Sequence, residues 1–89
     1  MQFFQRDYIM ETEIKSRGYT DNVMSVSRSL PDRPLLAPKE IASVMGYSDE
    51  YVRRLVESGA VRATPAAGSE KANVRIYKLS FLDYLQSNQ

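Results

Sequence analysis

Two adjacent arginines, Arg53 and Arg54, are the side chains in this sequence best suited to binding another molecule. A guanidinium group carries a permanent charge and a planar fork of donors that matches phosphate oxygens and the edge of guanine. Glu50 and Arg54 stand four residues apart, which is the spacing of a salt bridge along a helix. Arg53 and Glu57 have the same spacing, so the helical pattern alone favours a solvated, salt-bridged surface over a binding face.

Catalytic and metal-binding constellations are missing from the sequence. The chain has no cysteine and no histidine, which excludes thiolate and imidazole ligands and a triad of the Ser-His-Asp kind. The carboxylates Glu11 and Glu13 lie on an alternating stretch without a phosphate-binding loop beside them. We therefore expect no enzyme, no catalytic residue, no metal, no cofactor and no small-molecule substrate.

Length and charge set further limits on the class of protein. Eighty-nine residues indicate one small domain with a modest core. Twelve Lys and Arg against eleven Asp and Glu give a net charge of +1, far from the strongly basic balance of a typical nucleic-acid binder. DNA binding would therefore depend on where the charges lie. No apolar run approaches the roughly 20 residues that span a bilayer, and the start lacks a secretory signal, so we expect a cytoplasmic protein that does not enter membranes.

The arginine pair belongs to the second of two short predicted helices, joined by a tight turn at residues 46–47. Pro38 suits the first position of the first helix. Ser48 can cap the second helix, and Gly59 can end it. The apolar positions that we expect to face the core are Ile41, Ala42 and Met45 in the first helix and Val52, Leu55 and Val56 in the second. This pattern is typical of a helix-turn-helix unit.

Beyond Gly59 the periodicity changes to that of strands. Residues 61–64 and 73–78 predict two strands around a Pro/Gly/Ser-containing tip at 65–72, which makes a hairpin. In the second strand, Val74 and Ile76 would face one way and Arg75 and Tyr77 the other. A last helix is predicted to begin with Ser80 as its cap, with Asp83 completing a capping box. Its expected buried face is Phe81, Tyr84 and Leu85.

Residues 1–34 form an N-terminal extension whose structure the sequence leaves open. Alternation over residues 8–14 favours a strand, although the start of the chain also has helical spacing. Residues 20–30 read as a short helix capped by Thr20 or Asp21, or as a second strand. Residues 31–34 carry two prolines and make the best linker, so we divide the chain into this extension and a domain at 35–89.

The order helix, turn, helix, hairpin, helix over residues 35–87 resembles the excisionase-type branch of the MerR-like winged helix-turn-helix family. The matching stretches are Pro-Lys-Glu-Ile-Ala at 38–42, Gly-Tyr-Ser at 46–48, Val-Arg-Arg-Leu at 52–55, Gly-Ala-Val at 59–61 and Val-Arg-Ile at 74–76, followed by Phe81, Tyr84 and Leu85. The hairpin tip is longer and richer in alanine than the family pattern, and residues 1–34 match no part of it.

This resemblance implies an α+β fold, a small winged helix-turn-helix, and a DNA-binding function. Proteins of this branch bind and bend attachment-site DNA of a phage or mobile element and direct an integrase towards excision. They often bind cooperatively, so neighbouring copies and an integrase are the expected partners beside double-stranded DNA, and association with the nucleoid is the expected location. A small transcriptional regulator, or a winged-helix interaction module that does not bind DNA, are the alternatives.

The resemblance also assigns roles to individual residues. The second helix would enter the major groove, with Arg54 reading a guanine and Arg53 contacting phosphate. Tyr51 is as well suited to packing at the helix junction as to touching DNA. The full set of predicted DNA-binding residues is Lys39, Ser48, Glu50, Tyr51, Arg53, Arg54, Arg62, Lys71 and Arg75. These cations imply about four to six phosphate contacts, and hence a slope of log K against log salt of about −4 to −5.

Overall fold

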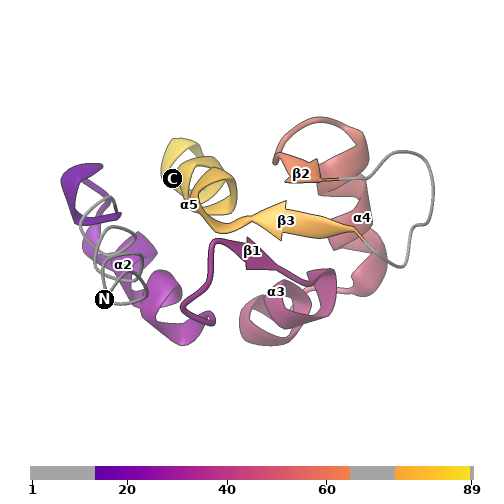
Figure 1. Ribbon diagram of the computed structural model, residues 1–89, viewed down its shortest axis with the longest axis horizontal. Coiled ribbons are helices and arrows are strands. Elements are labelled where there is room, and N and C mark those ends of the chain that lie inside the picture. Colours follow the sequence, from indigo (N-terminus) through magenta and orange to yellow (C-terminus); the bar gives the residue numbers. More distant parts are fainter. Residues whose placement is uncertain (1–13, 65–73, 89) are drawn as a thin grey trace, which may run out of the picture.

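Helices pack on one side of a small antiparallel sheet in the computed structural model, which describes residues 14–64 and 74–88 (Figure 1). The labelled elements are α2 (Asp21–Ser29), β1 (Leu35–Leu36), α3 (Pro38–Met45), α4 (Asp49–Glu57), β2 (Ala63–Thr64), β3 (Arg75–Tyr77) and α5 (Lys78–Ser87). The strand order is β1-β3-β2. The predicted α+β class is confirmed.

The α3–α4 pair has the boundaries and caps that the sequence predicts. Pro38 begins α3, and Gly46 ends it in the left-handed conformation, with φ of 72°. A residue with a Cβ is strained in that conformation, which is why glycine occupies the turn. The Ser48 Oγ accepts a hydrogen bond of 3.0 Å from the Tyr51 backbone N–H and so caps α4. Local sequence therefore determines where α3 begins and ends and where α4 begins.

Strand β3 is the centre of the sheet and pairs with a strand on each side. Ile76 lies opposite Leu36 of β1 and Ala63 of β2. Ile76 is fully buried whereas Arg75 and Tyr77 are exposed, so the predicted alternation of the strand is confirmed. Strand β1 was not predicted, because a run of two leucines carries no periodicity.

Helix α5 begins at Lys78, two residues earlier than the predicted cap at Ser80, so the predicted capping box is wrong. Strand β3 continues into the helix without a loop. The backbone N–H of Lys78 donates a hydrogen bond of 2.8 Å to the Pro34 carbonyl. The Ser80 Oγ instead accepts a 2.7 Å hydrogen bond from the Arg62 N–H. Asp83 accepts hydrogen bonds from the Arg17 guanidinium at 2.9 and 3.2 Å and from the Tyr19 hydroxyl at 2.6 Å.

The described part of the N-terminal segment contains two helical stretches, residues 14–16 and α2. Helix α2 occupies the stretch that read as a helix or a strand, and Thr20 caps it by accepting from the Val23 N–H at 3.4 Å. Ile14 belongs to a helical turn, so the strand expected over residues 8–14 is wrong at that residue. Residues 8–13 lie outside the described part of the chain.

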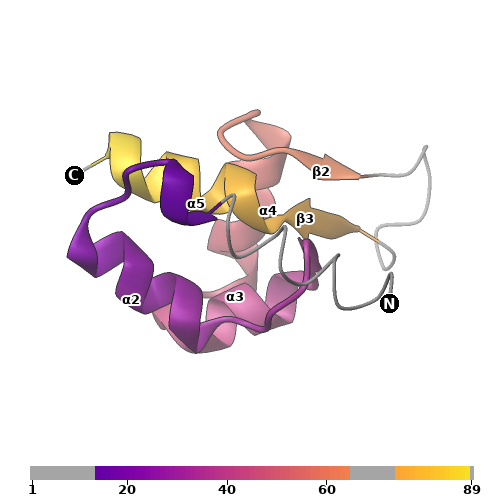
Figure 2. The same cartoon turned by 60° about the vertical axis from the view of Figure 1, so that its left-hand side comes forward.

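One hydrophobic cluster joins this segment to the rest of the fold. Helix α2 packs against α5 (Figures 1 and 2), and Val23 and Leu30 lie in the same core as Phe81. The buried apolar residues are Ile14, Val23, Leu30, Leu36, Ile41, Ala42, Val52, Leu55, Val61, Ile76, Phe81 and Leu82. Four residues predicted to be buried, Met45, Val56, Tyr84 and Leu85, are only partly buried against it. Removal of residues 1–30 would therefore take away part of the core.

In the part of the chain described here, no helix combines the length and the apolar character needed to cross a bilayer.

The contacts of Asp83 predict a local effect of its removal. We expect Asp83→Ala to lower the free energy of unfolding by about 1 kcal/mol, because the hydrogen bonds are charge-assisted but solvent-exposed. Amide hydrogen exchange should accelerate at residues 14–20 and remain unchanged in α4. Glu57→Ala removes an exposed carboxylate from a different helix and is the control. Equal exchange at residues 14–20 in the Asp83 variant and the wild type would contradict this role.

Candidate nucleic-acid interface

Helix α4 turns one side to the core and the other to solvent. Val52 and Leu55 are buried, and α4 packs against α3 through this side. Glu50, Arg53 and Arg54 are exposed. The apolar spacing of the helix therefore places the charged residues where another molecule can reach them.

Only one of the two predicted salt bridges along α4 is present among the described residues. The Arg54 Nη2 lies 3.4 Å from the Glu50 Oε2, and both side chains are more than 60% exposed. An exposed pair of this spacing is worth only about 0.3–0.5 kcal/mol, so Arg54 can be released cheaply to a partner. Within the described residues Arg53 forms no ion pair, and its guanidinium group remains available.

Tyr51 belongs to an aromatic cluster between α4 and α5. Its ring meets Tyr47 edge-on, with centroids 4.6 Å apart, and its hydroxyl lies 3.0 Å from the Tyr84 hydroxyl. Tyr84 in turn stacks near Phe81, at a centroid distance of 6.2 Å. Tyr51 is still 40% exposed. Of the two roles considered for Tyr51, packing at the helix junction is the one observed, and contact with DNA remains a prediction.

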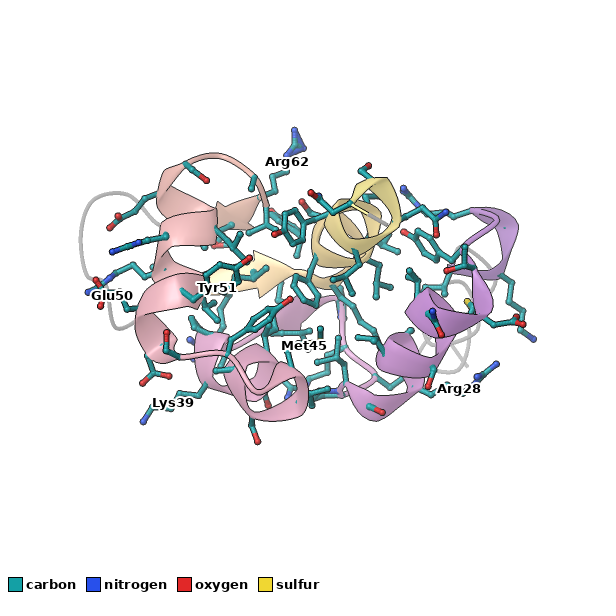
Figure 3. The ribbon with its side chains drawn as sticks, turned by 180° about the vertical axis from the view of Figure 1, so that it is seen from behind. Arg28, Lys39, Met45, Glu50, Tyr51 and Arg62 are labelled. Carbon is teal, nitrogen blue, oxygen red and sulfur yellow. The ribbon has the colours of Figure 1, made fainter. Side chains whose placement is uncertain are left out.

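The predicted binding residues do not all lie on one edge of the molecule. Lys39 and Glu50 point outward at the same end, whereas Arg62 projects from a different edge (Figure 3). Tyr51 lies between α4 and α5 in the same view. Ser48 is engaged in capping α4 through its Oγ. The structure therefore groups Lys39 with the start of α4 and separates Arg62 from it.

Arg75 lies on β3 with its side chain on the exposed face of the sheet, where it donates to the Val74 carbonyl at 2.9 Å. Its charge also acts on Glu40 in the first turn of α3. The pKa of Glu40 is lowered chiefly by the hydrogen bond from the Ala37 N–H, and the charges of Arg33 and Arg75 add to this effect. Arg33 also forms an ion pair with Glu40. Part of the positive field of Arg75 is therefore balanced within the protein.

Lys71, the remaining predicted cation, lies outside the described residues. The described residues contain no group of three acidic or other metal-ligating side chains that could hold an ion.

The sequence interpretation missed Lys78, which is only 2% exposed. The alternation in β3 carried the signal, because a pattern with Ile76 inward also turns residue 78 inward. The residue type gives no such signal, because lysine is rarely buried.

Comparisons with protein-family models, with characterised proteins and with solved structures found no match for this chain.

The tyrosine pair predicts a stability change at high pH. The hydrogen bond with Tyr51, together with burial, raises the pKa of Tyr84 to about 12. In the unfolded chain tyrosine titrates near pH 10, so this contribution is complete below about pH 10 and is lost as the pH rises towards 12. The free energy of unfolding of the wild type should therefore fall more steeply over this range than that of Tyr84→Phe, as measured by urea denaturation at successive pH values.

Tyr77→Phe is the matched control, because it removes an exposed hydroxyl that has no hydrogen-bond partner among the described residues. Its pH profile should follow that of the wild type. Identical profiles for Tyr84→Phe and the wild type would show that the pair does not contribute.

Proposed function

We propose that this chain is a sequence-specific, double-stranded DNA-binding protein with a winged helix-turn-helix, most simply an excisionase-type factor that directs an integrase towards excision. The observation that carries this function is the α3–α4 pair, with a left-handed glycine at its turn and the arginine-bearing face of α4 exposed. A helix held in this way has the diameter to enter a major groove about 12 Å wide.

The two arginines of α4 have different surroundings that suit different contacts. Arg54 is oriented by Glu50, and an arginine held in this way can present its fork to the O6 and N7 atoms of guanine. Arg53 has no ion-pair partner within the described residues, which suits a phosphate contact. Lys39, at the same end of the molecule, would add a second backbone contact.

The antiparallel pair β2–β3 supports the wing of the proposed fold. Thr64 lies opposite Arg75 at the point where the two strands leave the described part of the chain. At the base of such a hairpin, Arg75 could contact a DNA phosphate, although Glu40 balances part of its charge. Arg62 and Lys71 complete the proposed cations of this region.

The near-neutral charge favours assembly of several copies on DNA. A net charge of +1 gives one copy little long-range attraction, so useful affinity would come from neighbours bound side by side on repeated sites. This is the expected behaviour of an excisionase, while a transcriptional regulator would use the same face on single or paired sites. An integrase gene next to the gene for this protein would favour the first function.

The acidic side chains of α4 favour a second candidate function. Asp49, Glu50 and Glu57 outnumber the two arginines, and all five are exposed. Such a face would also suit a basic region of another protein, so an interaction module without DNA binding is the alternative.

Separate substitution of the arginines tests the proposed function. Bound sequences are first selected from random DNA at low and moderate salt, and affinities for the selected site are then measured. Arg54→Ala should cost about 1–3 kcal/mol and relax the preference at one base pair. Arg53→Ala should weaken binding to all sequences and reduce the salt slope by about 1.

The matched controls are Arg53→Lys and Arg54→Lys, which keep the charge but remove the fork. We expect Arg53→Lys to retain most of the affinity and Arg54→Lys to lose the base preference. Circular dichroism would check that each variant is folded. Unchanged DNA binding in both alanine variants would contradict the proposed role of α4, and the absence of any selected sequence would favour the interaction module.

A further inference from the structure

A cavity of about 300 Å³ lies between α2, the turn that precedes it and the start of α5. Its walls include the apolar side chains Ile14, Met24 and Leu30 and the charged residues Arg28, Asp32 and Lys78. Arg28 lies at the opposite end of the molecule from Glu50 of α4 (Figure 3). This cavity is therefore separate from the proposed DNA-binding face.

Lys78 is the most unusual residue of the cavity, because its side chain is almost fully buried. Its Nζ donates to the Ser27 carbonyl at 3.1 Å and to the Pro31 carbonyl at 3.0 Å. An ammonium group has three N–H donors, so one of them has no acceptor among the described residues. Both acceptors are neutral, and no described carboxylate forms an ion pair with Lys78.

A buried cation without an ion-pair partner is electrostatically costly. Burial lowers the pKa of Lys78, and the charge of Asp32, an exposed residue that also lines the cavity, opposes this effect without forming an ion pair with the lysine. An anion in the cavity would supply both the missing charge and the third acceptor. Charge-assisted hydrogen bonds of this kind are among the stronger polar contacts in proteins.

Holding the end of α2 does not by itself account for the lysine. The Ser27 carbonyl also accepts from the Leu30 N–H at 3.3 Å, and the Pro31 carbonyl also accepts from the Arg33 N–H at 3.0 Å. Both carbonyls therefore keep a backbone donor when the ammonium group is absent. A methionine at position 78 would have a similar length and would leave neither carbonyl unpaired.

We propose that this cavity binds a small organic carboxylate, whose charged group accepts a hydrogen bond from the Lys78 Nζ and whose short hydrocarbon part lies against Ile14, Met24 and Leu30. Arg28, which is exposed at the cavity, supplies a second positive charge. Ile14 and Leu30 are buried and Met24 is partly buried, so the hydrocarbon part would meet an apolar wall. This site does not depend on DNA binding by α4.

The test is a titration of the full chain with hexanoate, followed by amide chemical shifts in NMR spectra. Shift changes should concentrate on residues of the cavity and leave α4 unchanged. Acetate lacks the hydrocarbon part and hexanol lacks the charge, so both should bind more weakly than hexanoate. Inorganic phosphate should also bind more weakly, because it cannot use the apolar wall.

Lys78→Met should weaken hexanoate binding about tenfold or more, which is the loss expected for a charge-assisted hydrogen bond. Arg28→Gln should weaken it less, because that side chain is exposed and solvent screens its charge. Arg33→Gln also removes one exposed cation, but it lies outside the cavity walls, so hexanoate affinity should be unchanged.

Equal binding of hexanoate and hexanol, or an unchanged affinity in a folded Lys78→Met variant, would overturn the proposed site. So would the absence of shift changes at the cavity in the wild type. If Lys78→Met does not fold, the Arg28→Gln variant and the comparison of hexanoate with hexanol and acetate still decide the question.

Discussion

The pairing of β3 with a strand on each side is the interaction on which the rest of this structure depends. Ile76, at its centre, is fully buried and lies opposite both Leu36 and Ala63. Because β3 continues directly into α5, the same strand also determines where Phe81 and Leu82 enter the core. Loss of this pairing would separate α2 and α5 from the α3–α4 pair and expose both halves of a small core.

This arrangement gives a chain with little net charge a fixed, exposed pair of arginines, which is what the proposed DNA-binding face requires. The core holds Val52 and Leu55, so the arginines of α4 project from a fixed helix rather than from a mobile segment. Glu50 restrains Arg54 through a weak exposed contact, while Arg53 has no such restraint among the described residues. In the proposed function, specific recognition by α4 would therefore depend on the position and orientation of its arginines rather than on total charge.

Lys78, unlike the exposed arginines of α4, carries its charge in the interior of the protein. It lies at the junction of strand and helix, where the inward direction of the pleat carries it into the interior beside α2. Two backbone carbonyls accept its hydrogen bonds, yet neither neutralises it. The cost of this burial makes the neighbouring cavity a chemically distinct region, separate from the helix pair that resembles a DNA-binding unit.

Local sequence accounts for the helices α3 and α4 and the turn between them, because caps and apolar spacing act within a few residues. Pro38, Gly46 and Ser48 marked α3 and α4, and the alternation around Ile76 marked β3, whereas the stretch that forms α2 was left open between a helix and a strand. Contacts between residues that lie far apart in the chain follow from the tertiary structure alone. The two-residue strand β1, the transfer of Ser80 and Asp83 from a capping box to distant donors, the Tyr51–Tyr84 contact and the burial of Lys78 all depend on it. Local patterns cannot encode such contacts, since each one exists only when β3 and α5 have brought distant segments together.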